Sequence, residues 1–209
     1  MQLNLPGVPL FLQFKRADCM KKGNAKQIQE GLSLAIPFYR YSIMNREPND
    51  QHELLLNLDV GSNVVFYAAP RFHLVQELNV AYLANAIAAS SSFIRPRDIG
   101  TLSYERHCVA YDYSQYFVCS EPREIHGQSG ESLEGQFLER LSVDERPLQD
   151  GVLQDVLGTM ESALKRLRIS PQSIDAIPKP DRPLRMAHQI ADLALRYFGA
   201  QFFVVQKIA

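Results

Sequence analysis

Two short apolar runs constrain the fold of this 209-residue chain most strongly. Residues 64–69 form a continuous apolar run that ends at Pro70, a pattern typical of a central strand covered on both faces. Residues 10–14 form a second run, rich in strand-forming side chains and preceded by the turn signal Pro6-Gly7. Both runs predict buried strands, so the fold must be built around a sheet.

Further elements follow from periodicity. We expect strands at residues 38–43, 92–94 and 202–205, and a hairpin formed by residues 107–111 and 116–119. We expect helices at residues 51–58, 73–89, 132–141, 149–168 and 184–198. This order predicts a mixed α+β protein, with a single central mixed sheet flanked by helices. We expect one domain over residues 1–209, with a core at about 8–120 and a helical C-terminal part at about 131–209.

Composition limits the classes of function. A hydrophobic content of 46% supports a real core, and a net charge of −1 argues against a protein coated in positive charge for nucleic-acid binding. A local basic patch lies near the N-terminus, at Lys15, Arg16, Lys21, Lys22 and Lys26. The chain has no long apolar span and no signal-peptide pattern, and its three cysteines lack metal-site spacing. These features predict a cytoplasmic protein with reduced thiols and no membrane association.

Gln13 and Lys15 stand at the end of the first strand, on either side of Phe14. Residues two apart in a strand point to the same face, so we expect an amide oxygen and a cation side by side at the rim of the sheet. Burying such a pair without partners is costly, which favours a functional role. The alternative is an edge-strand pair whose polar ends reach solvent.

This strand ending in Gln-x-Lys, followed by a helix and by the strand Val-Val-Phe-Tyr-Ala-Ala-Pro, resembles the PD-(D/E)XK superfamily of restriction-endonuclease-like nucleases. The resemblance covers roughly residues 8–95. It implies a Mg²⁺-dependent phosphodiester hydrolase of a prokaryotic restriction or antiviral defence system. Gln13 would be a catalytic residue and metal ligand, and Lys15 the catalytic lysine.

The chain departs from the family pattern in one respect. The family's metal-binding Asp precedes the x-Lys strand, whereas residues 1–8 contain no acid. The resemblance leaves three alternatives open: the start of the chain is shortened, another residue supplies the carboxylate, or the fold has lost catalysis. Asp18 and Glu53 are the nearest acids in sequence and are the candidate metal ligands.

Four basic residues are candidates for contacts with nucleic acid. They are Arg16, Arg40, His52 and Arg71. His52 opens a predicted helix, where a phosphate would be favoured, or it packs under the following leucines. Arg71 and His73, two residues later, follow a central strand at the edge that often carries ligands, or they start the next helix.

A second hypothesis is a non-catalytic protein- or nucleic-acid-binding subunit on the same fold, with a protein partner or a homo-oligomer as its assembly. We expect exposed tyrosines to contribute to such an interface, namely Tyr39, Tyr41, Tyr113 and Tyr116. Cys119 follows a strand and is either a nucleophile or an inert thiol; with no base nearby in sequence, the inert thiol is favoured.

Overall fold

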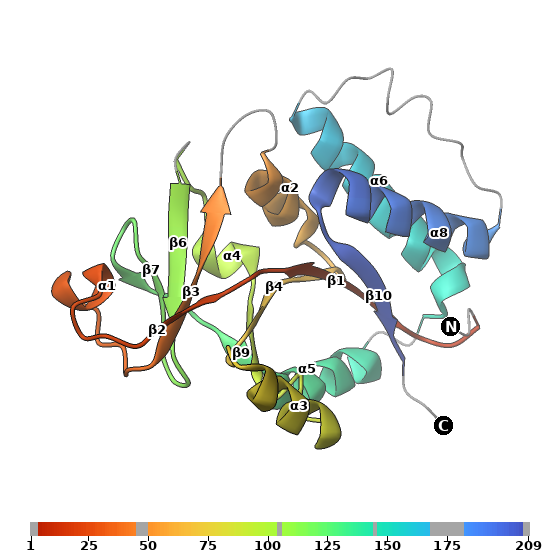
Figure 1. Cartoon of the computed structure of the whole chain (residues 1–209). Coiled ribbons are helices and arrows are strands. Elements are labelled where there is room, and N and C mark those ends of the chain that lie inside the picture. The colour runs from red at the N-terminus through yellow and green to blue at the C-terminus, as the bar shows by residue number, and fades with distance from the viewer. Residues whose placement is uncertain (1–3, 45–49, 104–105, 144–145, 168–181, 207–209) are drawn as a thin grey trace. The chain divides into compact units, whose positions relative to one another are not determined.

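The computed structural model describes residues 4–44, 50–103, 106–143, 146–167 and 182–206 (Figure 1). Helices and strands are both abundant and the described strands form two five-stranded sheets, so the α+β class is confirmed. The expectation of a single sheet is wrong. The chain divides into two compact units, one comprising Met1–Gln13, Glu53–Val65 and Gly135–Ala209, and the other Phe14–His52 and Phe66–Glu134. The predicted single domain stays a prediction.

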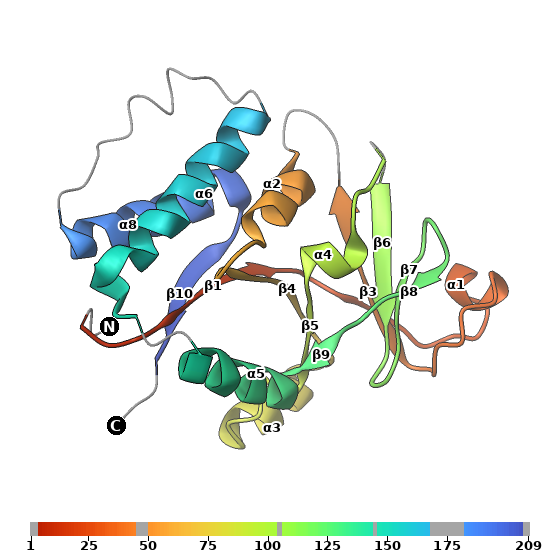
Figure 2. The same cartoon turned by 180° about the vertical axis from the view of Figure 1, so that it is seen from behind.

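The first unit combines a strand pair with helices. β1 (Val8–Phe14) runs antiparallel to β10 (Gln201–Val205), with Val8 opposite Val205 and Leu12 opposite Gln201. The helices are most of α2 (Gln51–Leu58) and of α5 (Gly130–Val143), α6 (Leu153–Arg166) and α8 (Pro183–Leu193), with π-helical turns η1 (Leu148–Val152) and η2 (Ala194–Phe198). α6 and α8 lie side by side in both views (Figures 1 and 2).

The spacing of buried apolar residues in α6 and α8 explains why these two helices pack together. α6 buries one stripe of side chains, at Leu153, Val156, Leu157, Met160, Ala163 and Leu164. α8 buries a matching stripe, at Met186, Ala187, Ile190 and Leu193. Each stripe repeats every three or four residues, which places it on one face of its helix. Gly199 follows η2 in the left-handed conformation, with φ of 59°, and ends the helical segment, a position at which glycine is favoured.

The second unit is mainly antiparallel sheet. One sheet has the order β2 (Asp18–Met20), β3 (Phe38–Met44), β6 (Arg106–Tyr111), β7 (Tyr116–Val118) and β8 (Arg123–Glu124). The segment from Phe66 to the end of β4 (Val64–Pro70) pairs with β5 (Ser91–Ile94), which pairs with β9 (Gln128–Ser129). The short helices are α1 (Lys26–Gln29), α3 (Val75–Leu83) and α4 (Pro96–Ile99).

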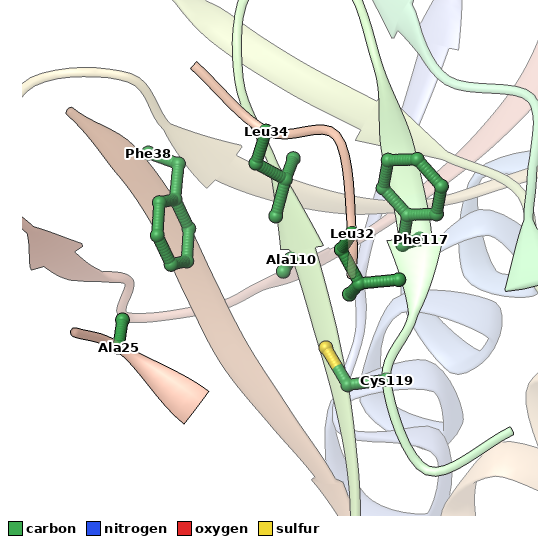
Figure 3. Close-up of a cluster of buried hydrophobic side chains, with 7 residues drawn as sticks. All are labelled: Ala25, Leu32, Leu34, Phe38, Ala110, Phe117 and Cys119. Atoms are coloured by element: carbon green, nitrogen blue, oxygen red, sulfur yellow. The ribbon is translucent and has the colours of Figure 1, made fainter. Parts of the chain in front are cut away.

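An apolar cluster covers one face of the five-stranded sheet of this unit (Figure 3). Its buried members are Ala25, Leu32, Leu34, Phe38, Ala110, Phe117 and Cys119. Asp112 fixes the neighbouring turn. Its carboxylate accepts backbone N–H bonds from Ala35 at 2.7 Å, Ser114 at 2.7 Å and Gln115 at 2.8 Å. Burial alone would raise the pKa of Asp112, but these hydrogen bonds outweigh it and lower the pKa below its usual value.

One predicted helix differs from the structure in a way that matters for function. The helix expected at residues 73–89 is shorter, and Ala81 is the buried residue among those of α3. Leu74, Leu78 and Tyr82, which share a face at helical spacing, are exposed. The period of a sequence shows that apolar residues share a face, but it does not show that anything covers that face.

Candidate functional site

Lys15 lies just after β1, and its backbone N–H donates to the carbonyl of Ala68 in β4 at 2.8 Å. The side chain is half-buried, and its Nζ lies 5.1 Å from the centroid of the Tyr67 ring. Burial lowers the pKa of Lys15 from 10.5 to about 8. No carboxylate in the described parts of the chain forms an ion pair with this amine, so the aromatic face is its main electrostatic partner.

His52 and Tyr67 form a hydrogen-bonded pair beside the lysine. His52 Nδ1 lies 2.7 Å from the Tyr67 hydroxyl, and His52 Nε2 lies 2.7 Å from the carbonyl oxygen of Gly100. A carbonyl only accepts, so Nε2 carries the proton and Nδ1 accepts the hydrogen bond from Tyr67. Burial lowers the pKa of His52, and the positive charge of Lys15 lowers it further. His52 is therefore neutral at pH 7 and holds the Tyr67 ring under the amine.

A chain of tyrosine rings continues from Tyr67 through the second unit. Ring centroids lie 6.0 Å apart for Tyr67 and Tyr41, 6.0 Å for Tyr41 and Tyr111, and 6.1 Å for Tyr111 and Tyr116. The Tyr111 hydroxyl donates to the carbonyl of Pro70 at 2.7 Å. The Tyr41 hydroxyl is buried and has no hydrogen-bond partner among the residues described. Burial raises the pKa of Tyr41 and Tyr111, so both are neutral phenols.

Arg71 lies at the Tyr116 end of this chain of rings. It is buried, its Nη2 donates a hydrogen bond to the Tyr116 hydroxyl, and its guanidinium carbon lies 5.7 Å from the ring centroids of both Tyr113 and Tyr116. Its Nε has no hydrogen-bond partner within the described residues. The structure therefore places Arg71 inside the second unit, rather than on a surface that faces a nucleic acid.

The tyrosines do not occupy the positions expected from the sequence. Tyr39, Tyr41 and Tyr116 are buried, so the prediction that they are exposed is wrong; Tyr113 alone of the four is exposed, at 68%. Alternation along β3 explains the burial, because Tyr39 and Tyr41 share one face of the strand with the buried Ile43. The pairing of β3 with β6 then brings Tyr111 opposite Tyr39, a contact that local sequence does not reveal.

Gln13 has a structural partner. Its side chain is 4% exposed, and its Nε2 lies 3.3 Å from the carbonyl of Phe198 and 3.5 Å from that of Gly199. These carbonyls end a helical segment and lack partners within it, so the Gln13 amide stabilises the end of η2. Gln13 belongs to the first unit and Lys15 to the second, because the boundary between the units falls after Gln13.

The other predicted residues are dispersed. Asp18 is exposed in β2, and its carboxylate lies 3.9 Å from Nε of Arg40. Glu53 lies in the first turn of α2 and belongs to the first unit. Arg16 is exposed beside Lys15 in the chain. Of the candidate residues, the structure brings together Asp18 with Arg40 and, through Tyr67, Lys15 with His52. Tyr67 was not predicted.

The residues named for a Mg²⁺ site do not fit one within either unit. Mg²⁺ prefers several oxygen ligands in octahedral geometry, including one or two carboxylates. The Asp18 carboxylate already pairs with Arg40, the Gln13 amide nitrogen holds a helix end, and Glu53 lies in a different unit from Asp18. The described residues contain no group of three or more His, Cys, Asp or Glu side chains that could hold a metal ion.

Comparison with known proteins adds no family or function. No family model, no curated protein and no solved structure matches the chain. Within the described residues, no helix is long and apolar enough to cross a membrane.

Proposed function

We propose that the chain is a restriction-endonuclease-like domain whose second unit binds a phosphodiester of nucleic acid at Lys15. The observation that carries the proposal is a half-buried amine that has no carboxylate partner among the described residues and is held over the Tyr67 ring. A desolvated cation of this kind is costly to the fold, and such costs are concentrated at functional sites. A phosphate would supply the negative charge that the amine lacks.

The surroundings of the amine favour an anion over a cation. His52 is neutral, and its one N–H is used in the hydrogen bond to the carbonyl of Gly100. Arg16 follows Lys15 in the chain and is exposed, so a second positive charge is available one residue away in the sequence. We therefore assign Lys15 and Arg16 as the contacts to the phosphate backbone, and His52 and Tyr67 as the residues that position Lys15.

Fluorescence anisotropy with labelled single-stranded and duplex DNA and RNA tests this proposal. Lys15→Met keeps the apolar stem of the side chain and removes the charge. We expect it to weaken binding and to reduce the slope of log affinity against log salt by about 1, as for the loss of one phosphate contact. Lys26→Met is the matched control, because Lys26 carries the same charge but is exposed and paired with Glu30 at 3.4 Å.

Two further readouts separate binding from cleavage. Affinity of the wild type should fall as pH rises through about 8, because Lys15 then loses its proton. A plasmid and oligonucleotide assay with Mg²⁺ or Mn²⁺ tests for strand cleavage, which should be absent in Lys15→Met. Equal binding by the wild type and Lys15→Met at every salt concentration would refute the phosphate contact.

A second candidate function, a protein interface, rests on α3. Tyr82 and Leu83 expose 71% and 81% of their surface, and Val75 and Val80 are also largely exposed. At 100° per residue these side chains lie within an arc of about 160°, which forms one broad face of the helix. Exposed apolar surface of this kind usually marks a binding site.

We propose a second copy of the chain as the occupant of this surface, since an isologous pairing would cover α3 with α3. Light scattering after size exclusion should give a dimer for the wild type and a monomer for Leu83→Glu. Val143→Glu is the control, because Val143 is equally exposed, at 81%, but lies in α5. A wild-type monomer at every concentration would exclude the dimer and leave the phosphate proposal untouched.

A further inference from the structure

Cys108 and Cys119 face each other across two antiparallel strands of the second unit. Val109 pairs with Val118 in the register of β6 and β7, which places Cys108 opposite Cys119. The backbone N–H of Cys119 donates to the carbonyl of Cys108 at 2.8 Å. Hydrogen-bonded partners in antiparallel strands have Cα atoms about 5.5 Å apart. Disulfides span Cα separations of about 4.4–6.8 Å, so the spacing typical of this position falls within the disulfide range.

The two thiols differ in character. They hydrogen-bond to each other, and this bond lowers the pKa of Cys108; burial opposes the effect, and Arg40 and Arg106 add to it. The same hydrogen bond and burial raise the pKa of Cys119. Cys108 is partly exposed, whereas Cys119 is buried against the apolar cluster drawn in Figure 3. The pair therefore contains one accessible sulfur that favours the thiolate and one protected sulfur that keeps its proton.

The third cysteine cannot join this pair. Cys19 lies opposite Tyr39 in β3, whereas Cys108 lies opposite Ser42. Tyr39 and Ser42 are three residues apart in one strand, so they point to opposite faces of the sheet. Burial raises the pKa of Cys19, which makes it a poorer nucleophile. Cys19 therefore serves as an internal control for the reactivity of the other two thiols.

We propose that Cys108 is a hydroperoxide-reactive thiol and that Cys119 resolves it to a cross-strand disulfide. The Cys108 thiolate attacks one peroxide oxygen, the O–O bond breaks, and the other oxygen leaves as water or an alcohol after taking a proton. The sulfur of Cys119 then attacks the sulfenic acid on Cys108, the S–O bond breaks, and the hydroxyl leaves as water with the Cys119 proton. Two thiols lose two electrons in total, and the peroxide is reduced by the same two electrons.

Residues other than the cysteines prepare this step. Arg40 and Arg106 contribute positive charge near Cys108, which favours the thiolate before peroxide arrives; the Asp18 carboxylate, paired with Arg40, opposes part of this effect. The side chain of Arg106 donates to the Ser42 hydroxyl at 3.2 Å, which fixes it on the strand pair that carries Cys108. The proposal is independent of the phosphate contact at Lys15.

Peptide mass mapping tests the proposal on the intact chain. The reduced protein is treated with hydrogen peroxide, its remaining thiols are alkylated, and it is digested with trypsin. Cys108 and Cys119 fall in one peptide, residues 107–123, and Cys19 in another, residues 17–21. We expect the first peptide to lose about 2 Da and to resist alkylation, as a disulfide requires. The second peptide should remain alkylated.

Variants separate the two roles. In Cys119→Ser the sulfenic acid on Cys108 should persist and be captured by dimedone. In Cys108→Ser the thiol of Cys119 should stay reduced at the same dose. Cys19→Ser should behave as the wild type. Three outcomes would overturn the assignment: oxidation of all three cysteines at equal rates, faster reaction at Cys19, or disulfides formed only between molecules. Each of these outcomes can be seen in the wild type, so the test stands even if a variant fails to fold.

Discussion

Replacing Lys15 by Met should stabilise the protein at neutral pH, which is the opposite of the usual effect of a substitution at a half-buried position. Burial lowers the pKa of Lys15 from 10.5 to about 8. At about 1.4 kcal/mol per unit this shift corresponds to an upper limit of about 3 kcal/mol for placing the charged amine in its site. Partial exposure of the side chain screens the charge, so we expect a gain of about 1–3 kcal/mol for Lys15→Met.

The direction in which the free energy of unfolding changes with pH provides a second test. Between about pH 8 and 10.5 the folded chain has released the Lys15 proton while the unfolded chain still holds it. The unfolded state then binds more protons, so the free energy of unfolding rises with pH across this window. Below about pH 8 both states are protonated and the cost is fully present. The advantage of Lys15→Met should therefore be largest at pH 7 and shrink as pH rises towards 10.5.

Urea denaturation of the wild type and Lys15→Met at pH 7, 8, 9 and 10, under reducing conditions, measures this difference. Other groups that titrate over the same range are common to both proteins and cancel in the comparison. A Lys15→Met protein that is less stable than the wild type, by the same amount at every pH, would refute the reasoning. It would show that the contact with Tyr67 is a structural cation–π interaction and that Lys15 is not held at a cost.

Four other substitutions test the polar contacts and close packing of the second unit, each by urea denaturation. Tyr41→Phe should leave the free energy of unfolding unchanged or raise it by about 1 kcal/mol, because the lost hydroxyl has no partner among the described residues, whereas Tyr111→Phe should lower it by about 1 kcal/mol. Asp112→Asn should be destabilising at pH 7, and its difference from the wild type should vanish as pH falls through the low folded-state pKa of Asp112, because protonation removes the same charge. Gly130→Ala should lower the free energy of unfolding by about 1–3 kcal/mol, since the added Cβ would lie 2.4 Å from the backbone of Ala88. Destabilisation by Tyr41→Phe, an Asp112→Asn effect independent of pH, or a neutral Gly130→Ala would each contradict the corresponding contact.

Local sequence predicted the elements whose pattern is complete within a few residues. The apolar run at residues 64–69 became β4, and the predicted helix at residues 51–58 coincides with α2. Gly199 ends its helical segment as its type suggested. Each of these features depends on the backbone preferences and the apolar pattern of one short segment, and both can be read from the local sequence.

The rest depends on contacts between distant segments. Nothing near Phe38–Met44 indicates that β3 pairs with β6 in a second sheet. The partner of His52 is Tyr67, fifteen residues away, and no spacing rule connects a helix start to a strand centre. Gln13 and Lys15 do not form the side-by-side pair that their spacing predicted, and the reason is local. β1 ends at Phe14, so Gln13 belongs to the first unit and Lys15 to the second. Only the expectation of a special role for Lys15 remains as a proposal.

The positions of unsatisfied buried polar groups in the second unit support a functional role for Lys15. Buried polar groups are normally hydrogen-bonded, yet the Tyr41 hydroxyl and Arg71 Nε have no partner in the described part of the chain. Both lie on the run of tyrosine rings that begins at Tyr67, under the amine of Lys15. Three unfavourable placements on one connected set of side chains are difficult to explain by packing alone, because apolar residues of similar size would fill the same space at lower cost. A site that binds an anion at Lys15 gives a reason for retaining a polar interior at this position.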